Sequence, residues 1–229
     1  MEFTISEAWQ EQYPGATIGI LALDNASNPG NHPALEVQKQ ALEQDLRRQY
    51  GEIDRATLRS LPVLQAYHNY YKRFKKSYHV QLQLESVASK GKSIPQVAAL
   101  VEAMFMAELK NQLLTAGHDL AKVVSPFGVD VADGDEDYER INGQEQRLKK
   151  GDMFIADAKG VMSSIIYGPD RRTQISTGTT AAVFTVYAPE GIDRASVESH
   201  LGDIRAYISL FSPELVVLDQ RVYSAKAGA

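Results

Sequence analysis

The segment Val97-Ala98-Ala99-Leu100-Val101-Glu102-Ala103-Met104-Phe105-Met106 is apolar except for a single charge, and the fold prediction starts from it. Apolar side chains surround this segment on nearly every side when it is drawn as a helix, and Leu109 continues the pattern. A helix that is apolar all round is normally buried. We therefore predict a central, buried helix within residues 93–116.

Glu102 is the charge in the middle of this apolar run. Burying a lone carboxylate costs free energy unless the group is paired or lines a wet cavity. Two interpretations follow, a structural ion-pair partner and a polar group in a binding pocket, and the residues alone do not separate them.

The rest of the chain carries both helix and strand signals. Apolar, partly β-branched runs predict strands, and apolar spacing with caps or prolines predicts helices. The predicted strands are residues 16–23, 153–157, 161–167, 173–176, 182–187 and 215–218. The predicted helices are residues 34–50, 54–61, 62–74 and 193–210. No repeat or linker divides the chain, so we expect one α+β domain over residues 1–229, with a mixed or antiparallel β-sheet core and surrounding helices.

Composition excludes several classes of function. The 229 residues include no cysteine, which removes disulfides, thiol nucleophiles and cysteine metal sites. A net charge of −5 argues against bulk attraction to nucleic acid, so an RNA contact would need a local basic patch. The N-terminus has no signal-peptide pattern, and no apolar run is long enough to cross a bilayer. We expect a cytoplasmic protein without a membrane partner.

Neither metal ions nor nucleotide cofactors are predicted. The 5 histidines show no ligand spacing. Asp133-Gly134-Asp135-Glu136-Asp137 is similar to the start of a calcium loop, but the later glycine and glutamate are missing, which favours a solvated acidic turn. Glycine-rich phosphate loops are also missing from the sequence.

Four short motifs between residues 71 and 120 carry a family resemblance. They are Tyr71-Lys72-Arg73-Phe74, Lys90-Gly91-Lys92-Ser93-Ile94-Pro95, Leu100-Val101-Glu102 and His118-Asp119-Leu120. Their order resembles that of the B3/B4 domain of the phenylalanyl-tRNA synthetase β subunit, and especially its stand-alone bacterial relatives. Gly151–Asp157, Asp170–Thr173 and Ile175–Thr180 are similar to later segments of that domain, so the resemblance covers roughly residues 60–190.

This sequence also departs from the family pattern. The family helix often begins Ile-Asn-Pro and carries a second asparagine one turn later, where this chain has Val97-Ala98-Ala99 and Phe105. The family tyrosine before Asp is His118. These changes make one wall of the expected pocket more apolar and leave the bound side chain open.

The resemblance implies hydrolysis of the ester that joins a wrong amino acid to its tRNA. Water is the nucleophile, so the protein has to position water and stabilise the oxyanion. The implied catalytic candidates are Glu102, His118, Asp119, Thr177, Thr179 and Thr180. The implied contacts to the amino acid are Phe105, Gly178 and Tyr167. Each candidate also has a structural interpretation, as a connecting turn, a surface pair or an ion pair.

Basic residues are the implied contacts to the phosphates of the tRNA 3′ end. They are Arg73, Lys90, Lys92 and Arg171. Arg73 ends a segment that also contains Tyr67, Tyr70 and Tyr71, which suggests either a surface that stacks bases or an ordinary helix end. Two alternatives to the hydrolase stay open, a tRNA- or RNA-binding module without catalysis and an amino-acid-binding protein that uses the same pocket.

Overall fold

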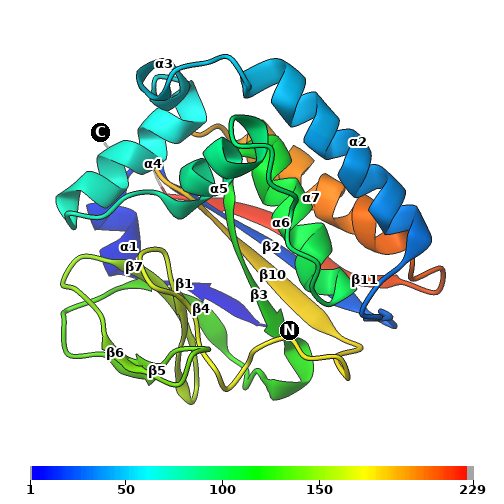
Figure 1. Ribbon diagram of the computed structural model, residues 1–229. Coiled ribbons are helices and arrows are strands. Elements are labelled where there is room, and N and C mark those ends of the chain that lie inside the picture. Colours follow the sequence, from blue (N-terminus) through cyan, green and yellow to red (C-terminus); the bar gives the residue numbers. More distant parts are fainter. Residues whose placement is uncertain (1, 226–229) are drawn as a thin grey trace.

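A four-stranded antiparallel sheet forms the centre of the protein (Figure 1). The computed structural model describes residues 2–225. The strands of this central sheet, in spatial order, are β11 (Val216–Ser224), β2 (Thr17–Asp24), β10 (Ala182–Ala188) and β3 (Leu114–Asp119). β2 and β10 are buried along almost their whole length, which explains why both are unbroken apolar runs in the sequence. β3 is an edge strand, and this position matters for the site.

Helices cover one face of the central sheet. The helices of this layer are α2 (Pro33–Tyr50), α5 (His79–Ala88), α6 (Ala99–Asn111) and α7 (Arg194–Ser209). α7 packs on the sheet, α6 lies beside α7 and β3, and α2 contacts both α5 and α6 (Figure 1). Gly19 permits the close approach of α7, because a Cβ there would lie 2.6 Å from Val197 Cγ1.

A second sheet packs near β3 and β10. Its strands, in spatial order, are β1 (Phe3–Ile5), β4 (Phe127–Val131), β7 (Met153–Asp157), β8 (Gly160–Ser164) and β9 (Gly168–Pro169). β1 runs parallel to β4, and the other neighbours are antiparallel. Ser163 of β8 joins the two sheets, since its Oγ lies 2.8 Å from Tyr187 Oη and 3.2 Å from His118 Nε2.

Short elements complete the fold. They are α1 (Glu7–Gln12), α3 (Arg55–Arg59), α4 (Pro62–Arg73), the 3-10 turn η1 (Leu120–Lys122) and the hairpin β5 (Asp137–Glu139) and β6 (Glu145–Arg147). No helix within residues 2–225 is both long and apolar enough to cross a membrane.

The α+β class and most predicted elements are confirmed, including the caps Asp54 and Asp193. The predicted helix over residues 93–116 is wrong at both ends. α6 stops at Gln112, which adopts a left-handed conformation with φ 62°, and residues 114–119 then form β3 because they pair with β10. Residues 93–98 belong to no helix or strand, and Ala98, which precedes the helix, has an extended backbone. The predicted strand at residues 173–176 is reduced to one bridge between Gln174 and His118.

Tyr67, Tyr70 and Tyr71 do not form a base-stacking surface. All three are buried, with 0%, 3% and 1% of their surface exposed. Their hydroxyls bond inward, as Tyr70 Oη does to Asp152 Oδ1 at 2.8 Å. The sequence did not predict this burial, because tyrosine has both an apolar ring and a polar hydroxyl group. In α4 the rings are buried and the hydroxyl groups form hydrogen bonds inside the protein.

Candidate functional site

A chamber of about 230 Å³ lies between α6, the edge strand β3, the strand β9 and the segment that follows β9. Val101, Met104 and Phe105 of α6 form one wall, at the spacing that places side chains on one helix face. Ile175 and Pro169 contribute to the opposite wall. An apolar cavity of about 150 Å³ is enough to bind benzene. The chamber is therefore large enough for an aromatic or branched aliphatic side chain.

Glu108 is the acidic residue of the chamber, and it was not among the residues predicted from the sequence. It follows Met104 by one helical turn, and 2% of its surface is exposed. Its Oε1 accepts a hydrogen bond from Thr115 N–H at 2.7 Å. Burial raises the pKa of Glu108 to about 8. A second carboxylate on a helix otherwise apolar all round was the signal that could have found it.

A chain of polar groups leads from the chamber to α7. Asn111 Nδ2 donates to Asp203 Oδ2 at 2.9 Å. The same amide nitrogen lies 3.2 Å from His200 Nδ1, so His200 Nδ1 accepts a hydrogen bond from Asn111. The ring proton then sits on Nε2, 2.7 Å from Oγ1 of Thr115, which lines the chamber. Burial lowers the pKa of His200 to about 4, so the ring is neutral. This contact fixes the position of the Thr115 hydroxyl.

The main chain of β3 also faces the chamber. Thr115 N–H points to Glu108 and Asp119 N–H points to Thr173 O at 2.7 Å, so both point away from β10. Main-chain groups alternate along a strand, so the N–H of Gly117 points the same way. Gly117 lines the chamber, and a Cβ on it would lie 2.9 Å from Ile175 Cδ1. Only glycine keeps this part of the chamber open without a shift of its neighbours.

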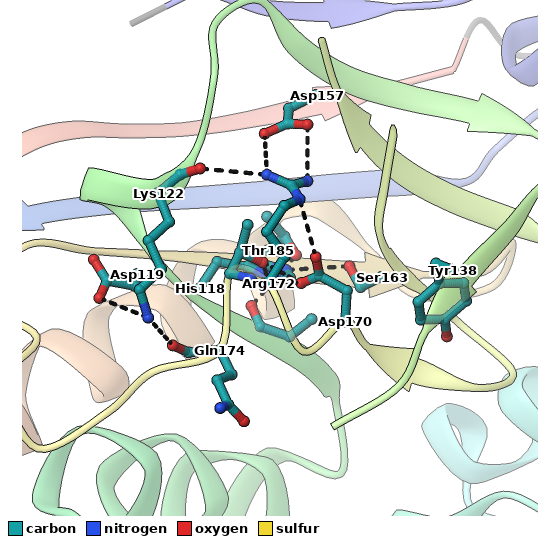
Figure 2. Close-up of polar contacts among 12 residues, drawn as sticks. His118, Asp119, Lys122, Tyr138, Asp157, Ser163, Asp170, Arg172, Gln174 and Thr185 are labelled. Atoms are coloured by element: carbon teal, nitrogen blue, oxygen red, sulfur yellow. Dashed lines mark hydrogen bonds and ion pairs between the residues drawn. The ribbon is translucent and has the colours of Figure 1, made fainter. Parts of the chain in front are cut away.

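His118 is held inside a buried network instead of facing the chamber (Figure 2). Thr173 Oγ1 donates to Asp170 Oδ1, and it lies 2.7 Å from His118 Nδ1, which therefore donates. The second ring nitrogen, Nε2, is left to accept from Ser163 Oγ at 3.2 Å. Burial, with a further contribution from Arg172, lowers the pKa of His118 to about 3. Both ring nitrogens are thus engaged in structural contacts.

Arg172 anchors the same network and the loop that carries Ile175. It donates to both oxygens of Asp157 at 2.9 Å, and its Nε lies 3.5 Å from Asp170 Oδ2 (Figure 2). Hydrogen bonds from Arg172 and from main-chain N–H groups hold the pKa of Asp157 low although burial opposes them. A bidentate arginine–carboxylate pair is a geometrically specific contact. The loop wall of the chamber is thereby tied to β7.

Asp119 and Thr179 contact each other on the far side of β3 from His118. Thr179 Oγ1 donates to Asp119 Oδ2 at 2.8 Å and accepts from Ser176 N–H at 2.9 Å. Lys122 Nζ lies 3.4 Å from the same Asp119 oxygen. Successive side chains of a strand point to opposite faces, so the predicted His118–Asp119 pair does not come together.

The turn of Thr177, Gly178 and Thr180 is exposed, and none of the three lines the chamber. Ile175, two residues before this turn, does line it. The turn is therefore adjacent to the chamber wall along the chain but does not form it.

Glu102 forms a buried ion pair on the other side of α6. Its Oε1 lies 3.2 Å from Lys39 Nζ, which also lies 2.6 Å from Glu36 Oε2. Val97 N–H donates to Glu102 Oε2 at 3.3 Å. Glu102 is not among the residues that line the chamber. The ion-pair interpretation accounts for its contacts.

Phe105 stands between the chamber and a second hollow of about 150 Å³. Lys92 and Ile94 contribute to the second hollow. Of the remaining candidates, Lys90 is exposed, and Tyr167 is half-buried with Lys76 Nζ 5.5 Å from its ring centroid. The structure thus places Phe105 in the chamber and Tyr167 outside it.

Arg73 belongs to a basic cleft of about 440 Å³. The cations of this cleft are Arg73, Lys75, Lys149 and Lys150. No ion pair within the described residues uses any of these four side chains. Arg171 is not part of the cleft, since its Nη1 pairs with Glu139 Oε1 at 2.6 Å.

Within residues 2–225, no three histidine or carboxylate side chains gather as they would around a metal ion. The site is defined instead by an apolar chamber, one buried carboxyl group and the edge of a strand. An enclosed apolar cavity with a few polar groups is typical of small-molecule or side-chain binding sites.

Comparison with known proteins identifies the family. The B3/4 domain family matches residues 66–206, and the chain belongs to this family. Among solved structures, the chain is similar to an N-terminal fragment of the phenylalanyl-tRNA synthetase beta-subunit from Pyrococcus horikoshii, with 10% identity and a TM-score of 0.48. The similarity covers 96% of this chain and 50% of that chain, so this protein spans about half of the fragment. No curated protein matches the chain.

Proposed function

We propose that the protein hydrolyses aminoacyl-tRNA esters and holds the amino-acid side chain in the chamber. The observation that carries this proposal is the chamber itself, because its lining residues fall within the segment that matches the B3/4 domain family. The solved relative is part of a tRNA synthetase, which supports a tRNA-linked substrate. A cytoplasmic location would follow from such a substrate.

The chamber discriminates by size and polarity. Its α6 wall is apolar, and Phe105 closes it toward the second hollow. Apolar pockets of this kind separate side chains that differ by one methylene by about 1–3 kcal/mol. We expect an apolar or aromatic amino acid to be the preferred group.

The edge of β3 is suited to the ester itself. An aminoacyl ester is already activated, so hydrolysis needs a positioned water and a donor for the developing oxyanion. The outward N–H of Gly117 is the proposed donor. Glu102, His118, Asp119 and Thr179 would then support the walls, because their side chains bond to protein groups.

The basic cleft and the exposed turn are the proposed contacts to tRNA. Arg73 remains a phosphate contact in this proposal, joined by Lys149 and Lys150. Lys75 adopts a left-handed backbone with φ 56°, which is uncommon for a residue other than glycine. Four cations in one cleft form the local patch that a chain of net charge −5 would need to bind RNA.

Further contacts would come from the residues around the second hollow and from the exposed turn. The exposed residues Lys90, Lys92, Thr177, Gly178 and Thr180 are available to the tRNA end. Arg171 would have to exchange its pair with Glu139 for a phosphate.

A deacylation assay tests the proposal. Purified protein is mixed with a panel of tRNAs, each charged with a correct or an incorrect amino acid, and release of the amino acid is followed. At least one aminoacyl-tRNA is expected to lose its amino acid faster than in buffer alone. If no aminoacyl-tRNA in the panel loses its amino acid faster than in buffer alone, the proposed hydrolase activity is refuted.

A non-catalytic role is the second candidate. It is favoured by the engagement of both His118 nitrogens and of Glu102 in structural contacts. Binding without turnover would take one of two forms. Thermal stabilisation by free amino acids alone would indicate an amino-acid-binding protein, and salt-dependent tRNA affinity would indicate an RNA-binding module.

A further inference from the structure

Glu108 has one engaged carboxyl oxygen and one free one. Oε1 accepts the N–H of Thr115 at 2.7 Å. In the part of the chain that the structure describes, no hydrogen bond reaches Oε2, and this oxygen is not among the fully buried atoms left without a partner, so it faces the space of the chamber. The side chain is 2% exposed and lines the chamber. A carboxyl oxygen that faces the chamber without a protein donor is open to a hydrogen bond from a bound molecule, so a ligand in the chamber is its natural partner.

We propose that Oε2 of Glu108 binds the ammonium group of an amino-acid derivative whose side chain fills the chamber. The inference rests on the proposed function for one point, the identity of the ligand as an amino-acid derivative. It adds the residue that selects compounds with an amino group.

The groups around Glu108 favour a cationic partner. None of the described residues that line the chamber is lysine or arginine. The titratable neighbours are His79 of α5, Tyr67 and Tyr71 of α4, Tyr78 before α5, Tyr187 of β10 and, through Thr115, His200 of α7. Burial raises the pKa of all four tyrosines, so they stay neutral. A positive charge therefore has to come with the ligand.

The spacing along β3 fits the two ends of one amino acid. Glu108 is bonded to Thr115, and Gly117 lies two residues further on. Two residues span about 7 Å of a strand. An ammonium nitrogen and the carbonyl oxygen of the same amino acid, with a hydrogen bond at each end, can bridge that separation. The ammonium would contact Glu108 while the carbonyl accepts from Gly117 N–H.

Binding of a cation changes the protonation of Glu108. With the chamber empty, burial raises the pKa of this carboxyl to about 8, so the group is neutral at pH 6.5. A neighbouring cation favours the ionised form. An α-amino group with a pKa near 7.7–8.0 is already charged at that pH. Each binding event should thus release about 0.9 proton.

Isothermal titration calorimetry with matched amides tests this role. The ligands are L-phenylalaninamide and 3-phenylpropanamide, which lacks only the amino group, and L-leucinamide with 4-methylpentanamide. Titrations at pH 6.5 in phosphate and in Tris give the proton count from the difference in heat. We expect at least one amino compound to bind at least tenfold more tightly than its partner and to release close to one proton.

Glu108→Gln keeps the acceptor for Thr115 N–H and removes the charge. This variant should lose the tenfold preference and the proton release while it binds the des-amino amides as before. Glu145→Gln, at an exposed carboxylate on β6, is the control and should behave like the parent. Equal affinity within each pair, no proton release, or no binding by any of the four amides would overturn the inference.

The result is separable from the proposed function. The parent could bind the amides with proton release and yet leave aminoacyl-tRNA intact in the deacylation assay. This result would support the role of Glu108 and refute the hydrolase proposal. If Glu108→Gln still hydrolyses aminoacyl-tRNA and the parent shows no preference for amino compounds, the hydrolase proposal stands and the proposed role of Glu108 is refuted.

Discussion

Replacement of Glu108 by glutamine is predicted to stabilise the protein, and increasingly so as the pH rises. Burial raises the pKa of Glu108 from 4.5 to about 8, so the folded state keeps a proton that the unfolded state gives up. The stability that comes from keeping this proton is fully present below pH 4.5. As the pH rises from 4.5 toward 8, the free energy of unfolding falls by up to ~1.4 kcal/mol per pH unit. At pH 7 the loss reaches about 3 kcal/mol, and glutamine, which stays neutral, avoids it.

Urea denaturation at pH 5, 6, 7 and 8 measures the effect. The difference in unfolding free energy between Glu108→Gln and the parent should be small at pH 5 and should grow by roughly 2–3 kcal/mol by pH 7. The exposed Glu145→Gln on β6 serves as control and should give a small, constant difference. A pH-independent difference for Glu108→Gln would show that the chamber is wet and that its carboxyl group is ordinary, which would refute the reasoning about its charge.

Three further substitutions test the site. Gly117→Ala would place a Cβ 2.9 Å from Ile175 Cδ1, so amide binding in calorimetry should weaken about tenfold or more while the variant still unfolds cooperatively; unchanged affinity would place the ligand elsewhere. Glu102→Gln leaves Lys39 with one partner and should cost about 1–3 kcal/mol in urea denaturation without altering amide affinity; a selective loss of hydrolysis at unchanged stability would instead make Glu102 a site residue. Lys149→Ala combined with Lys150→Ala should lower the slope of log affinity for tRNA against log salt by about 0.7 per lost phosphate contact; an unchanged slope would exclude the basic cleft.

The architecture was largely readable from the sequence because the buried elements have strong local patterns. β2 and β10 are continuous apolar runs, and Asp54 and Asp193 cap their helices as expected. The boundary between α6 and β3 was not readable. Leu114–Asp119 becomes a strand because it pairs with β10, nearly seventy residues later, and no local propensity records that pairing.

The candidate site was readable only in part. Phe105 was found through the family resemblance, and it lines the chamber. Glu102 was singled out as the one charge in an apolar run, and His118 through the family resemblance and its neighbour Asp119. Their partners Lys39, Thr173 and Ser163, however, come from distant segments. Those tertiary contacts determine whether such a residue faces a cavity or the core.

Glu108 and Gly117 were missed for related reasons. A carboxylate in the last turns of a helix is usually solvated, and the burial of Glu108 depends on how α6 meets β3. The role of Gly117 depends on Ile175 and Met104 approaching from two other segments. In both cases the decisive fact is a distance between segments, which the one-dimensional pattern does not contain.

The role of the chamber in hydrolysis can be measured with a variant in which a large side chain fills the chamber. Val101→Trp adds bulk at the α6 wall, and Val37→Trp adds the same bulk at a position of α2 that is 63% exposed. We expect the parent and Val37→Trp to release the amino acid from the same tRNA at similar rates, and Val101→Trp to be at least tenfold slower although it remains folded. Full activity in Val101→Trp, or no activity in the parent on any charged tRNA, would contradict this expectation.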